Sequence, residues 1–101
     1  MSFASDVQAV TKTADGQAIT GRTRIQGVYY TCTANSSSFD LRNGTGNTDT
    51  PLITVNSPAA AGAYSILIPD NGVLFDSGVY VDVADGNVES VTVFYVGGGA
   101  A

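Results

Sequence analysis

The residues that could do acid–base chemistry are aspartates that stand close together in two places. Asp70 and Asp76 form one pair, and Asp82 and Asp85 form the other. Two neighbouring carboxyl groups can divide the roles of general acid and general base. Aspartate beside glycine and asparagine is also typical of turns, because its short side chain bonds to the nearby backbone. We favour turns. Since the chain has no histidine to act as a base, we expect no enzymatic activity.

Oxygen-bearing side chains that could bind calcium gather at residues 43–49 and 82–87. Neither segment matches the EF-hand loop, which requires a glutamate at its twelfth position, and we interpret both as solvated loops. Structural zinc is excluded because the chain has one cysteine, Cys32, and no histidine. Cys32 follows the apolar pattern of a strand, so we expect it to be buried. The sequence predicts no metal and no cofactor.

The charge balance limits the partners that the protein can bind. The net charge is −5, and the only cations are Lys12, Arg22, Arg24 and Arg42. Because nucleic acids and anionic membranes are bound by clustered Lys and Arg, we expect neither as a partner. Charged residues make up 13% of the chain, about half the usual share of ~25%. A surface of neutral polar side chains fits a protein packed into an assembly, and it also fits a robust extracellular module.

Aromatic residues give the strongest indication of a protein partner. Five of them lie on expected strands whose two faces are both apolar, which is more than one small core readily hides. Tyrosine is enriched at interfaces, so we favour an assembly surface over a purely internal core. Two arginines on one strand face could add contacts to acidic groups, although a solvated face explains them as well. The candidate interface residues are Arg22, Arg24, Tyr29, Tyr30, Tyr80, Phe94 and Tyr95.

The elements that must position these side chains are short strands. Between residues 64 and 95, four apolar runs are separated by turn sequences that contain glycine with aspartate, asparagine or serine. Asp85-Gly86 predicts a two-residue hairpin of type I′ between the last two runs. No segment has the period of an amphipathic helix. The pattern predicts one all-β domain over residues 1–101: an antiparallel β-sandwich, jelly-roll-like or a small barrel, of about seven to eight short strands.

Four segments carry more detailed expectations. Residues 7–13 predict a short edge strand. Residues 18–33 form the longest strand, and its apolar side changes near Val28, which indicates entry into the core or a crossing between sheets. The last strand, before Gly97, is apolar on both faces and is expected to be central or covered by a partner. Residues 97–101 are expected to be a flexible tail.

The start of the chain, MSFASDV, has neither the basic nor the apolar region of a secretory signal peptide. No apolar run approaches the roughly 20 residues that span a bilayer. We therefore expect the protein to be made in the cytoplasm, whatever its final location.

The chain resembles a group of small virion proteins of tailed bacteriophages, particularly marine and cyanobacterial ones. The resemblance spans most of the chain from Arg22 onward, and it is one of layout rather than of a diagnostic motif. It implies a β-sandwich that decorates or cements the capsid, or that belongs to the tail, and it brings no catalytic residues. The segments that carry it are GRTRIQGVYY (21–30), FDLRNG (39–44), PAAAG (58–62), IPDNGVLF (68–75), GVYVDV (78–83) and VTVFY (91–95).

These observations lead to a hypothesis of a non-enzymatic virion structural protein, most simply a capsid decoration or cement protein located in the virion. Its partners would be the major capsid protein or other virion proteins, and the protein itself is expected to be a homo-oligomer, with a trimer favoured. One alternative is a structural protein of the tail or of a fibre attachment. Another is a β-sandwich module that binds carbohydrate or another surface through exposed tyrosines and polar loops.

Overall fold

The computed structural model describes residues 7–101, which contain eight β-strands and no helix. All strand pairs are antiparallel. The predicted all-β antiparallel fold of about seven to eight strands is therefore confirmed, and the expected edge strand at residues 7–13 is β1. The strands are β1 (Gln8–Lys12), β2 (Gly16–Cys32), β3 (Ser37–Asn43), β4 (Pro51–Ser57), β5 (Gly62–Leu67), β6 (Val73–Phe75), β7 (Val79–Val83) and β8 (Val88–Ala100).

Two long strands, β2 and β8, hold the whole sheet together. The strand order is β1-β8-β2-β7-β3-β4, with β5 and β6 also paired to β2. The start of β2 pairs with β7, whereas its later part pairs with β6 and then β5. The continuous sheet thus has two parts: one of β1, β8, the later part of β2, β5 and β6, and one of the start of β2, β7, β3 and β4. The predicted long strand at residues 18–33 matches β2, whereas β8 is longer than predicted because it continues past Gly97 to pair with the start of β2.

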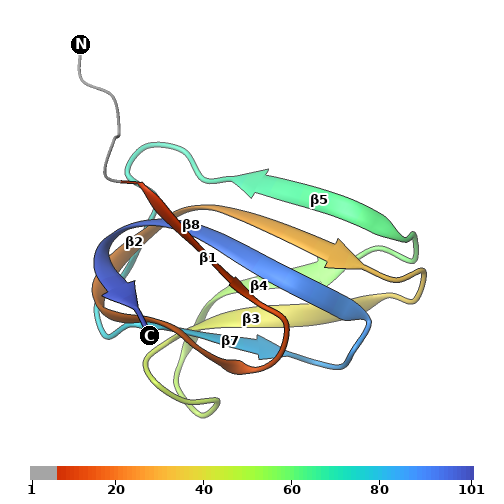
Figure 1. Ribbon diagram of the computed structural model, residues 1–101, viewed down its shortest axis with the longest axis horizontal. Helices are drawn as coiled ribbons and strands as arrows, with labels where there is room; N and C mark the ends of the chain where they lie inside the picture. Colours follow the sequence, from red (N-terminus) through yellow and green to blue (C-terminus); the bar gives the residue numbers. More distant parts are fainter. Residues whose placement is uncertain (1–6) are drawn as a thin grey trace.

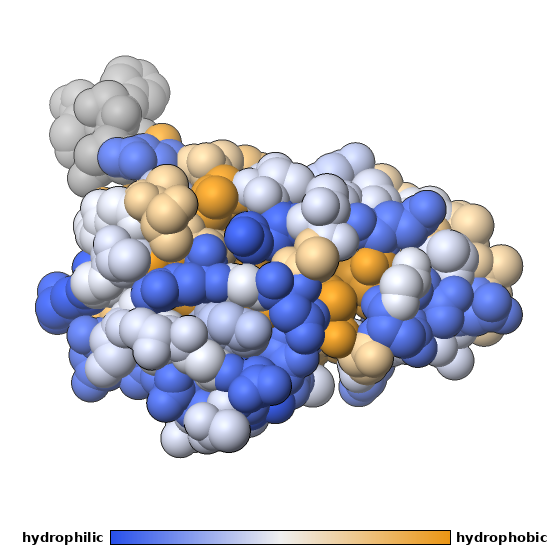
Figure 2. All heavy atoms as spheres, turned by 60° about the horizontal axis from the view of Figure 1, so that its bottom comes forward, coloured by the Kyte–Doolittle hydropathy of each residue, from blue (hydrophilic) through white to orange (hydrophobic). Residues whose placement is uncertain are grey.

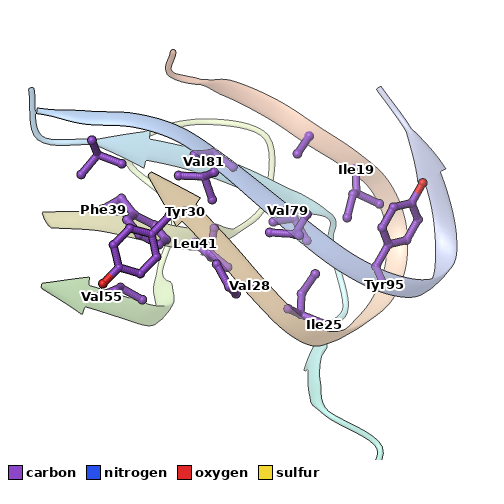
Figure 3. Close-up of a cluster of buried hydrophobic side chains, with 14 of the residues drawn as sticks. Ile19, Ile25, Val28, Tyr30, Phe39, Leu41, Val55, Val79, Val81 and Tyr95 are labelled. Carbon is purple, nitrogen blue, oxygen red and sulfur yellow. The ribbon is translucent and has the colours of Figure 1, made fainter. Parts of the chain in front are cut away.

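The side chains of the core lie between these two parts of the sheet, which gives a sandwich-like arrangement. Tyr30 on β2 and Phe39 on β3 are not on neighbouring strands, yet their rings meet edge-on with centroids 5.2 Å apart. Figure 3 shows these two rings and Val55 together at one end of the core, with Ile19 and Tyr95 at the other. Cys32 is buried in the same core, as predicted.

A β-bulge in β2 decides which of its side chains enter the core. The pairing of β2 with β8 shifts register between Ile25 and Gly27, and an earlier shift lies between Thr20 and Thr23. As a result Ile25 and Val28, three residues apart, are both buried. The predicted change of apolar side near Val28 is confirmed. The change of side falls at the register shift between Ile25 and Gly27. The exchange of partner strand, from β7 to β6, falls at the earlier shift between Thr20 and Thr23.

The C-terminal residues are not the flexible tail that the sequence predicts. β8 continues to Ala100 and pairs with the start of β2, and the Ala101 N–H donates to the carbonyl of Ala18 at 3.1 Å. Gly97 and Gly98 have φ of 79° and 62°, so the strand bends there. Figure 1 shows the end of β8 curling round beside β2. Gly97 and Gly98 allow a paired strand to bend, and they do not make the chain end flexible.

The predicted hairpin at Asp85-Gly86 is also wrong. β7 pairs with β2 and β3, while β8 pairs with β1 and β2, so the two strands on either side of this turn are not hydrogen-bonded to each other. Neither Asp85 nor Gly86 has a positive φ, which a type I′ turn requires at both positions. The segment instead carries the chain from one part of the sheet to the other. β8 has a neighbour on each side, so the expectation that the last strand is central is confirmed.

Candidate interaction surface

Of the four aspartates paired in the sequence, Asp76 and Asp85 are occupied by turn contacts. Asp82 instead lies on β7 and pairs with Arg42, so the turn predicted for it is wrong. The carboxylate of Asp76 accepts hydrogen bonds from Asn43 Nδ2 at 2.8 Å and from Ser77 Oγ at 3.0 Å, which lower its pKa below the ordinary value. Asp85 Oδ1 accepts from the backbone N–H of Asn87 at 2.9 Å and from Ser37 Oγ at 2.8 Å, and these bonds lower its pKa as well. Both carboxylates are held ionised in turns, as the favoured interpretation predicts.

The loop between β3 and β4 also uses its carboxylate internally. Asp49 Oδ2 accepts hydrogen bonds from the backbone N–H groups of Thr45 and Gly46 at 2.9 and 3.0 Å. Among residues 7–101, no three ligating side chains come together in a way that could hold a metal ion. No pocket opens on this part of the chain. The features that remain to recognise a partner are the two outer faces of the sheet.

The outer face of β3, β4 and β7 is charged. Arg42 lies between two carboxylates, with Nη2 3.0 Å from Asp40 Oδ2 and Nε 2.9 Å from Asp82 Oδ2. Thr54 on β4 donates to the other oxygen of Asp40 at 2.7 Å, and Tyr80 lies opposite Arg42 in the pairing of β3 with β7. We call these five residues the charged face. Figure 2 shows a side of the molecule on which hydrophilic residues predominate and hydrophobic ones reach the surface in smaller areas.

The outer face of β1, β8, the later part of β2 and β5 is mostly uncharged, and its charged residue on β2, Arg24, stands at one border opposite Val96 and Leu74. Residues directly opposite one another in antiparallel strands point to the same side, and the inner rows there are fixed by buried residues such as Val28 and Val93. The rows between them point outward. We call their ten side chains the neutral face: Ala9, Thr11, Tyr29, Thr31, Ala63, Ser65, Leu67, Ser90, Thr92 and Phe94.

Large apolar side chains gather at one end of the neutral face. Leu67 is 86% exposed, Tyr29 39% and Phe94 37%. Gly27 lies between two of them: a Cβ atom on this residue would be 3.4 Å from Phe94 Cδ2 and 3.8 Å from Leu67 Cδ2. Two hydroxyl pairs lie farther along the face: Thr11 and Thr92, bonded at 2.7 Å, and Thr31 and Ser90, bonded at 2.6 Å. The neutral face therefore has an apolar cluster of Tyr29, Leu67 and Phe94 at one end and mostly hydroxyl groups over the rest.

The structure divides the predicted interface residues into three groups. Tyr29 and Phe94 lie on the neutral face, and Arg24 borders it beside Val96 and Leu74 in the next row.

Tyr30 and Tyr95 are core residues, 5% and 1% exposed, so they are not available to a partner and their inclusion was wrong. They alternate with Tyr29 and Phe94 along the same strands, and adjacent residues of a strand point to opposite sides. Tyr80 lies on the charged face, and Arg22 is exposed at the bend of β2.

Sequence reasoning missed Leu67, the most exposed large apolar residue of the described chain. Its signal was the alternation in β5, where Ala63, Ser65 and Leu67 share one side while Tyr64 and Ile66 pack against the core. Comparison of the chain with protein-family models, curated proteins and solved structures finds no match. Residues 7–101 contain no helix that could cross a membrane.

Proposed function

We propose that this protein is a non-enzymatic structural protein that docks its neutral face onto the subunits of a larger particle. The observation that carries the proposal is the contrast between the two outer faces of one small sheet. One face concentrates Asp40, Arg42 and Asp82. The other holds ten uncharged side chains, among them Tyr29, Leu67 and Phe94. Covering an uncharged face does not remove water from charged groups, which would be costly. Buried aromatic side chains often contribute most of the binding energy of an interface.

The magnitude of the docking energy follows from the exposed apolar groups. Full burial of a leucine contributes about 1.5–3 kcal/mol relative to leaving it exposed, and Leu67 is almost fully exposed in the isolated chain. Tyr29 and Phe94 are already partly covered, so each has less exposed area to lose. Many copies on one particle would multiply such a contribution. This arrangement supports the addition of interface area between subunits as the mechanism of stabilisation.

Capsid decoration in a tailed bacteriophage is the specific role that we propose, with the virion as the location. The resemblance of segments 21–30 and 78–83 to small virion proteins of such phages supports this role. Docking through the neutral face would leave the charged face toward solvent. The net charge of −5 also keeps the protein away from the packaged genome, because like charges repel. Its partners would then be the major capsid protein or other virion proteins.

The test is to count the protein in purified virions and to vary the neutral face. A triple variant with Tyr29→Thr, Leu67→Thr and Phe94→Thr keeps strand-forming residues while removing the apolar cluster. Tyr80→Thr on the charged face is the matched control. We expect hundreds of copies per particle for the parent and the control, and few for the triple variant. We also expect particles without the protein to open at a lower temperature.

Three outcomes would contradict the proposal. Particles of unchanged heat stability after removal of the protein would eliminate the stabilising role. A copy number matching a single closed ring would assign the protein to the tail instead. Specific binding to a glycan array that is lost with Tyr29→Thr alone would favour a carbohydrate-binding module.

A further inference from the structure

The strand β5 is an unprotected edge of the sheet. Among the described residues, β1, β4, β5 and the three-residue β6 each pair on one side only. Natural edges are usually shielded by lysine, by proline, by bulges or by short length. β1 ends in Lys12 and β4 begins with Pro51. β5 has neither residue type, and it pairs with β2 over six consecutive residues with no shift of register.

The backbone groups that β5 leaves free can be identified from its pairing. The N–H of Ile68, the residue after β5, donates to the carbonyl of Gln26 at 3.0 Å. In an antiparallel pair, hydrogen-bonded and non-bonded positions alternate, so Ile66 and Tyr64 also point their backbone groups toward β2. The N–H and C=O groups of Ala63, Ser65 and Leu67 point away from β2. They form an open ladder about 13 Å long, given a rise of ~3.4 Å per residue.

The surroundings of this ladder favour a second copy of the chain as its occupant. No charged residue occurs from Thr50 to Pro69, a stretch that contains β5. Two copies of a protein with net charge −5 repel each other, and β5 brings no charged side chain of its own to the contact. Beyond β5 the first charged residue is Asp70, at a turn where it has φ of 60°.

We propose that β5 pairs antiparallel with β5 of a second copy, with the two-fold axis at Ser65. This register sets Leu67 beside Ala63 of the other copy, on the same side of the joined sheet. Each Asp70 meets Ala60 of the other copy, so the two carboxylates lie at opposite ends of the ladder, beyond the Debye length of about 8 Å at physiological salt. The contact is isologous and closed, which gives a dimer rather than the trimer expected from the sequence.

The dimer does not rest on the proposed function, because it uses the edge of β5 and not the docking of the neutral face. Edge contacts of this length belong to the small class of interfaces, below about 1,200 Å² of total buried area. We therefore expect a dimer that dissociates on dilution. The mass of the full chain in sedimentation should rise with concentration from its 10.3 kDa toward twice that value.

Two variants of Ser65 test the edge. Ser65→Pro removes an N–H that faces away from β2, so the fold keeps its own ladder while the edge loses a donor. Ser65→Lys brings two like charges together at the two-fold axis. Both variants should remain monomers at every concentration, with urea midpoints close to that of the parent. Asn56→Lys, the same charge change on the exposed side of β4, is the control and should still form the dimer.

A cross-link gives an independent measurement of the register. Residues paired on neighbouring strands have Cα atoms about 5.5 Å apart, within the range that a disulfide spans. Ser65→Cys should therefore form a disulfide-linked dimer on mild oxidation, whereas Asn56→Cys should not. The buried Cys32 takes no part. A parent chain that is monomeric throughout, a trimer, or a dimer that survives Ser65→Pro and Ser65→Lys would each overturn the proposal.

Discussion

Replacement of Gly98 by alanine tests the corner that closes the C-terminal end of the fold. Gly98 has φ of 62°, a left-handed conformation that costs an L-residue about 1–2 kcal/mol. A Cβ atom there would also clash with Thr23 Oγ1 and lie 2.8 Å from both the carbonyl oxygen of Thr20 and Ile19 Cγ2. Because the carbonyl oxygen of Thr20 is a backbone atom of β2, the backbone itself must shift.

The expected loss of stability for Gly98→Ala is about 2–5 kcal/mol, the sum of the conformational term and an overpacking term of roughly 1–3 kcal/mol. The adjacent Gly99 is a matched control. It has no positive φ, and a Cβ on it would meet nothing within 4 Å. Gly99→Ala should therefore be neutral or slightly stabilising, by up to about 1 kcal/mol, since alanine restricts the unfolded chain.

Urea unfolding of the two variants, followed by far-ultraviolet circular dichroism, measures the difference directly. The midpoint for Gly98→Ala should fall well below that of the parent with an unchanged slope, and the midpoint for Gly99→Ala should not fall. If both variants unfold at the same urea concentration, the bend at Gly98 does not contribute to the fold and residues 97–101 behave as the tail that the sequence predicts.

Three further predictions concern the charged face, the turns and the core. Arg42→Gln removes two ion pairs and leaves Asp82 opposite the carboxylate of Asp40, so it should destabilise the fold by about 2 kcal/mol. Adding Asp82→Asn should restore part of this loss. A loss below about 0.5 kcal/mol for Arg42→Gln would contradict the prediction. The folded-state pKa of Asp76 is lowered, so its contribution to stability is present above the unfolded pKa and is lost as the pH falls below about 4. In the Asp76→Asn variant the urea midpoint should therefore fall less steeply with acid than in the parent. The same acid dependence in both proteins would refute this prediction. Cys32 should react with a thiol reagent only after unfolding, and rapid labelling of the native protein would show that it is not buried.

Strand positions could be predicted because they depend on local composition and alternation. Cys32 was expected inside and lies there, and the last strand was expected to be central and has a partner strand on each side. The aspartates beside glycine were expected to form turns, and Asp76 and Asp85 are hydrogen-bonded in turns. Each of these features follows from a few neighbouring residues, which is the range over which a single sequence is informative.

The errors arise where partners distant in the chain decide the structure. Asp85-Gly86 has the composition of a tight hairpin, yet β7 and β8 belong to different parts of the sheet and the turn must connect them. Residues 97–101 read as a tail because glycine favours no local structure, but the start of β2 supplies a strand to pair with. Tyr30 and Tyr95 were assigned to a partner surface because five aromatics were judged too many for one small core, yet the core formed by strands distant in the chain buries both.

The two proposals reinforce each other through the geometry of antiparallel pairing. Side chains of directly paired residues lie on the same side of a sheet, so a β5–β5 contact places the neutral faces of both copies on one side of a continuous surface. Two apolar clusters, each formed by Tyr29, Leu67 and Phe94, would then meet a particle together. The second cluster would bind at the effective concentration set by the first, which raises the overall affinity without any new contact. Ser65→Pro, which breaks the dimer without adding a charge to the neutral face, should therefore weaken docking.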